Sequence, residues 1–128
     1  MADLNLYILL HENEAQKKTL QCLREENLNM KNHLLKTIKQ LDKNQYLKKI
    51  EVFQSEFIQQ DLIIDIFRTD QAQLLQNITL EKNENIKRSA SRDNKFLKFR
   101  KELRKYELGF IELKFKFYTF LQNIRDND

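Results

Sequence analysis

The sequence predicts an all-α protein made of three long helices that pack in the manner of a coiled coil. The chain has 128 residues, no proline and one glycine, whereas a β-sandwich or barrel needs many tight turns, which these two residues usually make. Charged residues make up 33% of the chain and apolar residues 41%, a mixture typical of long solvated helices with one apolar stripe. Apolar residues recur at alternating spacings of three and four, which is the heptad pattern of a coiled coil.

The first predicted helix covers about residues 3–41, with Asp3 as its N-cap or in its first turn. Its seam, meaning the positions that turn toward the core, consists of Leu6, Leu9, Asn13, Gln16, Leu20, Leu23, Asn27, Met30, Leu34, Thr37 and Leu41. Three of these positions hold amides. A buried asparagine lowers stability but selects one register or one partner. The alternative is that the amides lie at the ends of a bundle, where solvent reaches them and polar residues are tolerated.

The second predicted helix covers about residues 46–88. Its seam consists of Ile50, Phe53, Phe57, Gln60, Ile64, Phe67, Gln71, Leu74 and Ile78. This seam is out of phase with the first, so one continuous helix would have to overwind to keep both seams buried. We therefore expect a break at residues 42–45, where Asp and Asn suit a turn because their side chains bond nearby backbone amides.

The third predicted helix covers about residues 93–125, with Ser91, Asp93 or Asn94 as its cap. Its seam is apolar throughout: Phe96, Phe99, Leu103, Tyr106, Phe110, Leu113, Phe117, Phe120 and Ile124. A second apolar row lies beside the seam and consists of Leu108, Ile111, Phe115 and Tyr118. The apolar face of this helix is therefore wider than a two-stranded seam needs.

Residues 1–128 are expected to form a single coiled-coil-like domain, because short connections between helices of similar length make antiparallel neighbours. The simplest architecture is an antiparallel three-helix bundle that runs up, down and up. The rival architecture is a helical hairpin with a projecting arm that a second copy completes.

The aromatic face of the third helix is the candidate partner interface. Each aromatic side chain can bury on the order of 150–250 Å², which two thinner helices need not cover. The candidate residues are Phe96, Phe99, Tyr106, Phe110, Phe115, Phe117, Tyr118 and Phe120. The alternative is that this helix is simply the core of the monomer, since spacings of three and four are what packing alone requires.

No metal or nucleophilic site is expected from the histidines and the cysteine. His11 and His33 lie off the seam and far apart, and no His-x-x-x-His, Glu-x-x-His or Cys-x-x-Cys spacing occurs, so the usual metal-binding motifs are missing. Cys22 has no histidine nearby in sequence that could activate it, so a small, poorly exposed thiol is expected. No cofactor is predicted.

Catalysis is not expected elsewhere in the chain either. Gly109 is the only glycine and lies inside the third helix, which excludes a glycine-rich phosphate loop. Its expected role is to let a neighbouring helix approach. Asp61 and Asp65 lie one helical turn apart, but apolar residues surround them, so a solvated flank is expected rather than acid–base chemistry. We therefore predict that the protein is not an enzyme.

Positive charge gathers at the start of the third helix. Between Lys87 and Lys105, nine basic residues stand against only two acidic ones, Asp93 and Glu102. The candidate polyanion patch consists of Arg92, Lys95, Lys98, Arg100, Lys101, Arg104 and Lys105. Such a cluster can hold phosphates or an acidic partner. The alternative is a solvated helix start that pairs with acidic residues of the second helix, such as Glu56, Asp61, Asp65 and Asp70.

These patterns predict a non-enzymatic helical adaptor or structural subunit that acts through coiled-coil self-association or partner docking. Its partner would be a second copy or another helical protein. The alternative function is binding of nucleic acid or another polyanion through residues 87–105, although no base-reading motif occurs. The apolar run at residues 4–10 is too short to span a bilayer, Met1–Asp3 lacks the charge of a signal peptide, and one cysteine suits a reducing compartment. We therefore expect a cytoplasmic scaffold without a transmembrane segment.

Overall fold

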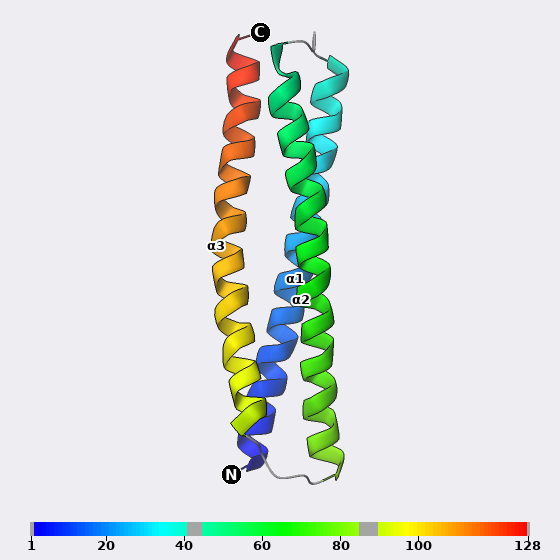
Figure 1. Cartoon of the computed structure of the whole chain (residues 1–128), viewed down its shortest axis with the longest axis vertical. Coiled ribbons are helices and arrows are strands. Elements are labelled where there is room, and N and C mark those ends of the chain that lie inside the picture. The colour runs from blue at the N-terminus through cyan, green and yellow to red at the C-terminus, as the bar shows by residue number, and fades with distance from the viewer. Residues whose placement is uncertain (1, 41–44, 85–89, 128) are drawn as a thin grey trace.

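The chain forms an all-α bundle of three long helices, as the heptad pattern predicts (Figure 1). The structure is a computed structural model that describes residues 2–40, 45–84 and 90–127. The helices are α1 (Ala2–Gln40), α2 (Leu47–Glu84) and α3 (Ala90–Asn127). Each is about 57 Å long at a rise of roughly 1.5 Å per residue. They run up, down and up, and α3 lies along the other two helices rather than projecting as an arm.

The helix boundaries agree with the predicted ones except at the start of α3. Asp3 lies in the first turn of α1, as expected. The predicted break at residues 42–45 and the predicted end of the second helix at residue 88 fall largely or wholly outside the described residues. Helix α3 begins at Ala90, so Ser91, Asp93 and Asn94 lie within it rather than before it. The prediction that one of these three caps the helix is therefore wrong.

The predicted seams form the hydrophobic core. Its buried apolar side chains are Leu6, Leu20, Leu23, Met30, Leu34, Ile50, Phe57, Ile64, Leu74, Ile78, Phe96, Phe99, Leu103, Phe110, Phe117, Phe120 and Ile124. Every one of them occupies a position that the spacing of three and four assigns to a seam. Apolar burial therefore explains why these segments pack along these faces, since burying one such side chain stabilises the fold by about 1.5–3 kcal/mol.

Buried amides join α1 to α2. The Asn13 amide donates to the backbone oxygen of Gln71 at 3.1 Å, and the Gln71 amide donates back to the Asn13 side-chain oxygen at 2.8 Å. The Asn27 amide donates to the backbone oxygen of Phe57 at 2.9 Å and to Asp61 at 2.8 Å. Asn13 and Asn27 are only 1% and 0% exposed, so the alternative that solvent reaches these amides is wrong. Because only one alignment makes these bonds, they select the register of α1 against α2.

Helix α3 stands farther from its neighbours than α1 and α2 stand from each other. Aromatic rings fill the wider space. Phe117 packs edge-on against Phe57 and Phe53, with ring centres 4.9 Å and 5.3 Å apart. Nearer the other end, the rings of Phe67 and Phe99 lie 5.9 Å apart. Aromatic side chains are larger than the asparagine and leucine side chains between α1 and α2, so they hold α3 at a larger distance.

Candidate functional site

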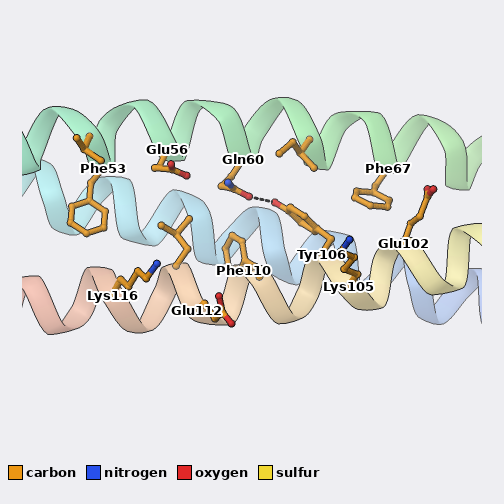
Figure 2. A pocket seen from close by; sticks show the side chains of 14 residues that line it. Phe53, Glu56, Gln60, Phe67, Glu102, Lys105, Tyr106, Phe110, Glu112 and Lys116 are labelled. Atoms are coloured by element: carbon orange, nitrogen blue, oxygen red, sulfur yellow. Dashed lines mark hydrogen bonds between the residues drawn. The ribbon is translucent and has the colours of Figure 1, made fainter.

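A long groove runs along the surface between α2 and α3 (Figure 2). Its central hollow has a volume of about 660 Å³. A hollow of about 450 Å³ shares Val52, Phe53 and Lys116 with it at one end, and a hollow of about 270 Å³ shares Glu102 at the other. Because neighbouring hollows share lining residues, they form one continuous channel, here called the α2/α3 groove.

The floor of the α2/α3 groove consists of seam residues that the bundle covers only in part. On α2 these are Phe53, Gln60 and Phe67, and on α3 they are Tyr106 and Leu113. Alternate seam positions of α2 are fully buried beneath them, as Phe57 and Ile64 show. The interface between α2 and α3 is therefore open to solvent on its outer side.

Tyr106 holds the two helices together at the floor of this groove. Its hydroxyl donates to the side-chain oxygen of Gln60 at 2.5 Å (Figure 2). Burial raises the pKa of Tyr106 well above its ordinary value, and the negative charge of Asp61 adds to the effect. The phenol therefore stays neutral at physiological pH and remains a hydrogen-bond donor.

Gly109 makes an opening in the α3 side of the groove. A Cβ atom placed on this residue would meet nothing within 4 Å, so no neighbouring helix uses the space. The prediction that Gly109 allows a close helix approach is therefore wrong for this chain alone. Ile63 lines the same hollow from α2 and is only partly buried.

Ion pairs bridge the other two helix–helix interfaces, whereas the residues that line the α2/α3 groove are joined across it by the hydrogen bond from Tyr106 to Gln60. Arg100 of α3 donates twice to Glu12 of α1, at 2.5 Å and 2.6 Å, and Lys114 donates to Glu26 at 2.8 Å. The hydrogen bond with Glu12 raises the pKa of Arg100. Between α1 and α2, Lys31 pairs with Asp61. Among the described residues that line the groove, no ion pair joins α2 to α3.

Most of the candidate aromatic interface lies inside the chain's own bundle. Five rings are core residues: Phe96, Phe99, Phe110, Phe117 and Phe120. Tyr106 is partly buried at the groove floor. Phe115, which is 73% exposed, and Tyr118, which is 36% exposed, are left on the surface. Phe115 and Tyr118 are therefore the exposed members of the candidate interface, and Tyr106 is open to solvent only through the α2/α3 groove.

Two rows of apolar side chains face outward from the bundle. On α3 the row contains Leu108, Ile111 and Phe115, and on α2 a comparable row contains Ile58, Leu62 and Ile66. All six side chains are more than half exposed. The α3 row is the second apolar row that the sequence indicates. The α2 row follows a spacing of four that sequence inspection alone did not single out.

The candidate polyanion patch divides into paired and unpaired residues. Arg92 is buried and pairs with Glu81 of α2 and with Asp93. Arg100 is held by Glu12. The expected pairing with acidic residues of α2 is present for Arg92 and Glu81. None of the four carboxylates named as examples, Glu56, Asp61, Asp65 and Asp70, forms an ion pair with a described residue of the patch.

The remaining residues of the patch are exposed. The Lys98 ammonium lies 3.9 Å from Glu102 of its own helix. Lys95, Lys101, Arg104 and Lys105 make no ion pair with any residue that the structure describes. Lys87 and Arg88 lie outside the described ranges. The patch that stays free is therefore smaller than the sequence indicates.

The described residues offer little chemistry of other kinds. Within the described ranges, no three His, Cys, Asp or Glu side chains gather closely enough to hold a metal ion, and no helix is long and apolar enough to cross a bilayer. Cys22 is exposed, so the expectation of a poorly exposed thiol is wrong. Asp61 is not a solvated flank, because it accepts from Asn27 and pairs with Lys31.

Comparison with known proteins adds no relative. No protein-family model, no curated protein and no solved structure matches this chain. The proposals that follow therefore rest on the geometry of the bundle and on its surface chemistry.

Proposed function

We propose that this chain is a non-enzymatic helical adaptor or structural subunit that acts through coiled-coil self-association or by docking another helical protein. The observation that carries the proposal is the pair of exposed apolar rows, Ile58–Leu62–Ile66 on α2 and Leu108–Ile111–Phe115 on α3. Single exposed apolar residues are ordinary, but contiguous groups of them mark interaction sites. Spacings of three and four keep each row on one side of its helix.

The two rows lie at similar heights along the bundle, which supports a common role. The ring contacts Phe53–Phe117 and Phe67–Tyr106 set the register of α2 against α3. By that register Leu62 and Leu108 lie within about 5 Å of one another in height at roughly 1.5 Å per residue. A partner that contacts the middle of the bundle therefore meets an exposed apolar row on either helix.

The proposed role requires neither a cofactor nor a catalytic group, because it depends on buried area alone. We place it in the cytoplasm, where a reducing environment suits the single, exposed cysteine Cys22.

The proposal is tested by adding charge to the α3 row. Leu108→Lys/Phe115→Lys is expected to abolish association measured by light scattering after size exclusion, because each lysine must stay solvated. The matched control, Gln21→Lys/Asn29→Lys, adds the same charge at exposed positions of α1 and should associate like the wild type. A wild-type chain that stays monomeric at high concentration and binds no helical partner would contradict the proposal.

A second candidate function is polyanion binding through the unpaired part of the basic patch. The supporting observation is that Lys101, Arg104 and Lys105 are exposed and, among the described residues, have no carboxylate partner. Binding should weaken steeply as salt rises, because bound counterions are released. Lys101→Glu/Arg104→Glu should remove it, whereas Lys17→Glu/Lys18→Glu on α1 makes the same charge change as a control. The absence of a retarded band in a low-salt gel shift would exclude this function.

A further inference from the structure

We propose that the α2/α3 groove is the contact face of a two-fold dimer, in which α2 of each copy lies over α3 of the other. This inference rests on the proposed self-association and assigns it to the groove, which adjoins the exposed row of α3 at Phe115, with a second copy of this chain as the partner. The dimer axis runs along the bundle, so the two copies point the same way. In the dimer, α2 and α3 of each copy form a four-helix arrangement that covers the α2/α3 groove of both copies.

The size of the groove fits a dimer contact. Its lining runs from Lys48 to Asn77 on α2, a length of about 44 Å at roughly 1.5 Å per residue. Two helices of that length and about 10 Å width present a footprint of roughly 900 Å² per copy. A stable, specific interface buries about 800 Å² per partner, so the face is large enough.

The chemistry of the lining also fits burial. The floor is aromatic, and its rings are half covered. Val52 and Phe115 stand at the rim, 59% and 73% exposed. The opening at Gly109 has no occupant within the monomer. The ring contacts Phe53–Phe117 and Phe67–Tyr106 put Ile63 and Gly109 within about 3 Å of one another in height at roughly 1.5 Å per residue. The two-fold operation therefore brings the partner's Ile63 to Gly109, where the missing side chain leaves room for it.

Two pairs of opposite charges in the lining support a second copy as the occupant. Glu56 of α2 and Lys116 of α3 line the same hollow, and so do Asp70 and Lys98. The ring contacts Phe53–Phe117 and Phe67–Tyr106 set the register of α2 against α3. By that register Lys116 lies within about 3 Å of Glu56 in height, and Lys98 within about 8 Å of Asp70, at roughly 1.5 Å per residue. With α2 lying over the other copy's α3 at equal height, Glu56 meets the partner's Lys116 and Asp70 meets the partner's Lys98. Symmetry repeats both pairs, so four opposite-charge contacts border the apolar centre.

The same charges argue against the other face-to-face dimer. A two-fold axis perpendicular to the helices would place α2 on α2 and α3 on α3, running in opposite directions. Glu56 and Asp70 are equally far from Ile63 in sequence, so a dimer centred there would bring each carboxylate against the partner's Asp70 or Glu56. Lys98 and Lys116 would meet in the same way on α3. Like charges placed opposite each other destabilise an interface.

Charge-reversed variants test this arrangement directly. In Glu56→Lys/Asp70→Lys, every inter-copy pair becomes positive on both sides, and in Lys98→Glu/Lys116→Glu every pair becomes negative. Each variant alone is expected to raise the dimer Kd by about tenfold or more. A one-to-one mixture should recover a heterodimer, because all four contacts then join opposite charges. Analytical ultracentrifugation measures the Kd, and circular dichroism checks that each variant is folded.

A bulky residue at Gly109 gives an independent test. In Gly109→Gln the new Cβ atom meets nothing within 4 Å, and the flexible side chain extends into the open groove. The monomer should therefore stay folded while the dimer Kd rises at least about tenfold. The control is Ala15→Gln, which places the same side chain at an exposed position of α1 and should leave the Kd unchanged.

The outcomes separate the inference from the proposed function. A wild-type dimer that is weakened by both sets of variants and restored in the mixture supports the groove contact. A dimer that neither set affects overturns the groove contact while leaving self-association in place. A wild-type chain that remains monomeric overturns the dimer, and binding of another protein's helix to the groove would then identify a different occupant.

Discussion

In the dimer that we propose, Gly109 costs stability in each copy of the chain and leaves room for the second copy. A glycine inside a helix is less favourable than alanine by about 1 kcal/mol, and nothing in the chain uses the space it leaves. We expect Gly109→Ala to raise the free energy of unfolding by about 0.5–1 kcal/mol. Urea unfolding at low protein concentration measures this without a contribution from association. A loss of stability would mean that another part of the chain occupies the space.

Tyr106 makes the stability of the bundle depend on pH in the alkaline range. Its folded pKa lies above that of the unfolded chain because burial opposes the phenolate. The folded state therefore holds this proton more tightly, so the stabilisation is complete below about pH 10 and is lost as pH rises above that value. Comparing urea unfolding at pH 8 and pH 11, Tyr106→Phe should lose less stability than the wild type. Equal losses would show that Tyr106 does not cause the alkaline effect.

The contact between α1 and α2 depends on buried amides as well as on leucines. Asn13→Ala leaves the buried Gln71 amide without its acceptor, and Gln71→Ala removes a partner from Asn13. Each change should lower the free energy of unfolding by about 1–3 kcal/mol. Because both remove the bond from the Gln71 amide to the Asn13 side-chain oxygen, the double variant should cost less than the sum, by about 0.5 kcal/mol or more. Additive losses would mean that the two amides act independently.

The basic segment of α3 combines a structural residue with surface residues. Arg92 is buried against Glu81, and breaking such a pair leaves an uncompensated charge, at a cost of about 3–5 kcal/mol. Lys101 is exposed and lies on the same helix, so its removal should change stability by about 0.5 kcal/mol at most. Thermal unfolding of Arg92→Ala and Lys101→Ala should therefore differ clearly. Similar midpoints would show that Arg92 does not anchor the end of the bundle.

At the scale of the whole molecule, folding and association should be linked. A dimer that forms only from folded chains raises the unfolding temperature as protein concentration rises. The wild type is expected to show this rise in differential scanning calorimetry over a hundredfold concentration range. Gly109→Gln should show a weaker rise that begins at higher protein concentration, because it weakens the dimer while leaving the monomer folded. A flat dependence for the wild type would contradict self-association at any surface.

Heptad spacing was enough to predict which residues enter the core. Each buried apolar side chain, from Leu6 to Ile124, lies on a predicted seam. The helical class and the three segments follow from the same periodicity, since a face that repeats every 3.5 residues can be buried only if the segment is helical. The second apolar row of α3 was visible for the same reason.

The groove, by contrast, could not be predicted from spacing. Periodicity states which side of a helix turns inward, but it does not state how far apart two helices stand. That distance depends on the side chains that meet across the seam: Asn13 and Asn27 let α1 and α2 approach, and Phe117 holds α3 away. The carboxylates that pair with Arg92 and Arg100 also depend on this arrangement. The sequence by itself determined three helices and their buried faces. Only the packing of these helices in space decided that the α2/α3 groove stays open to solvent.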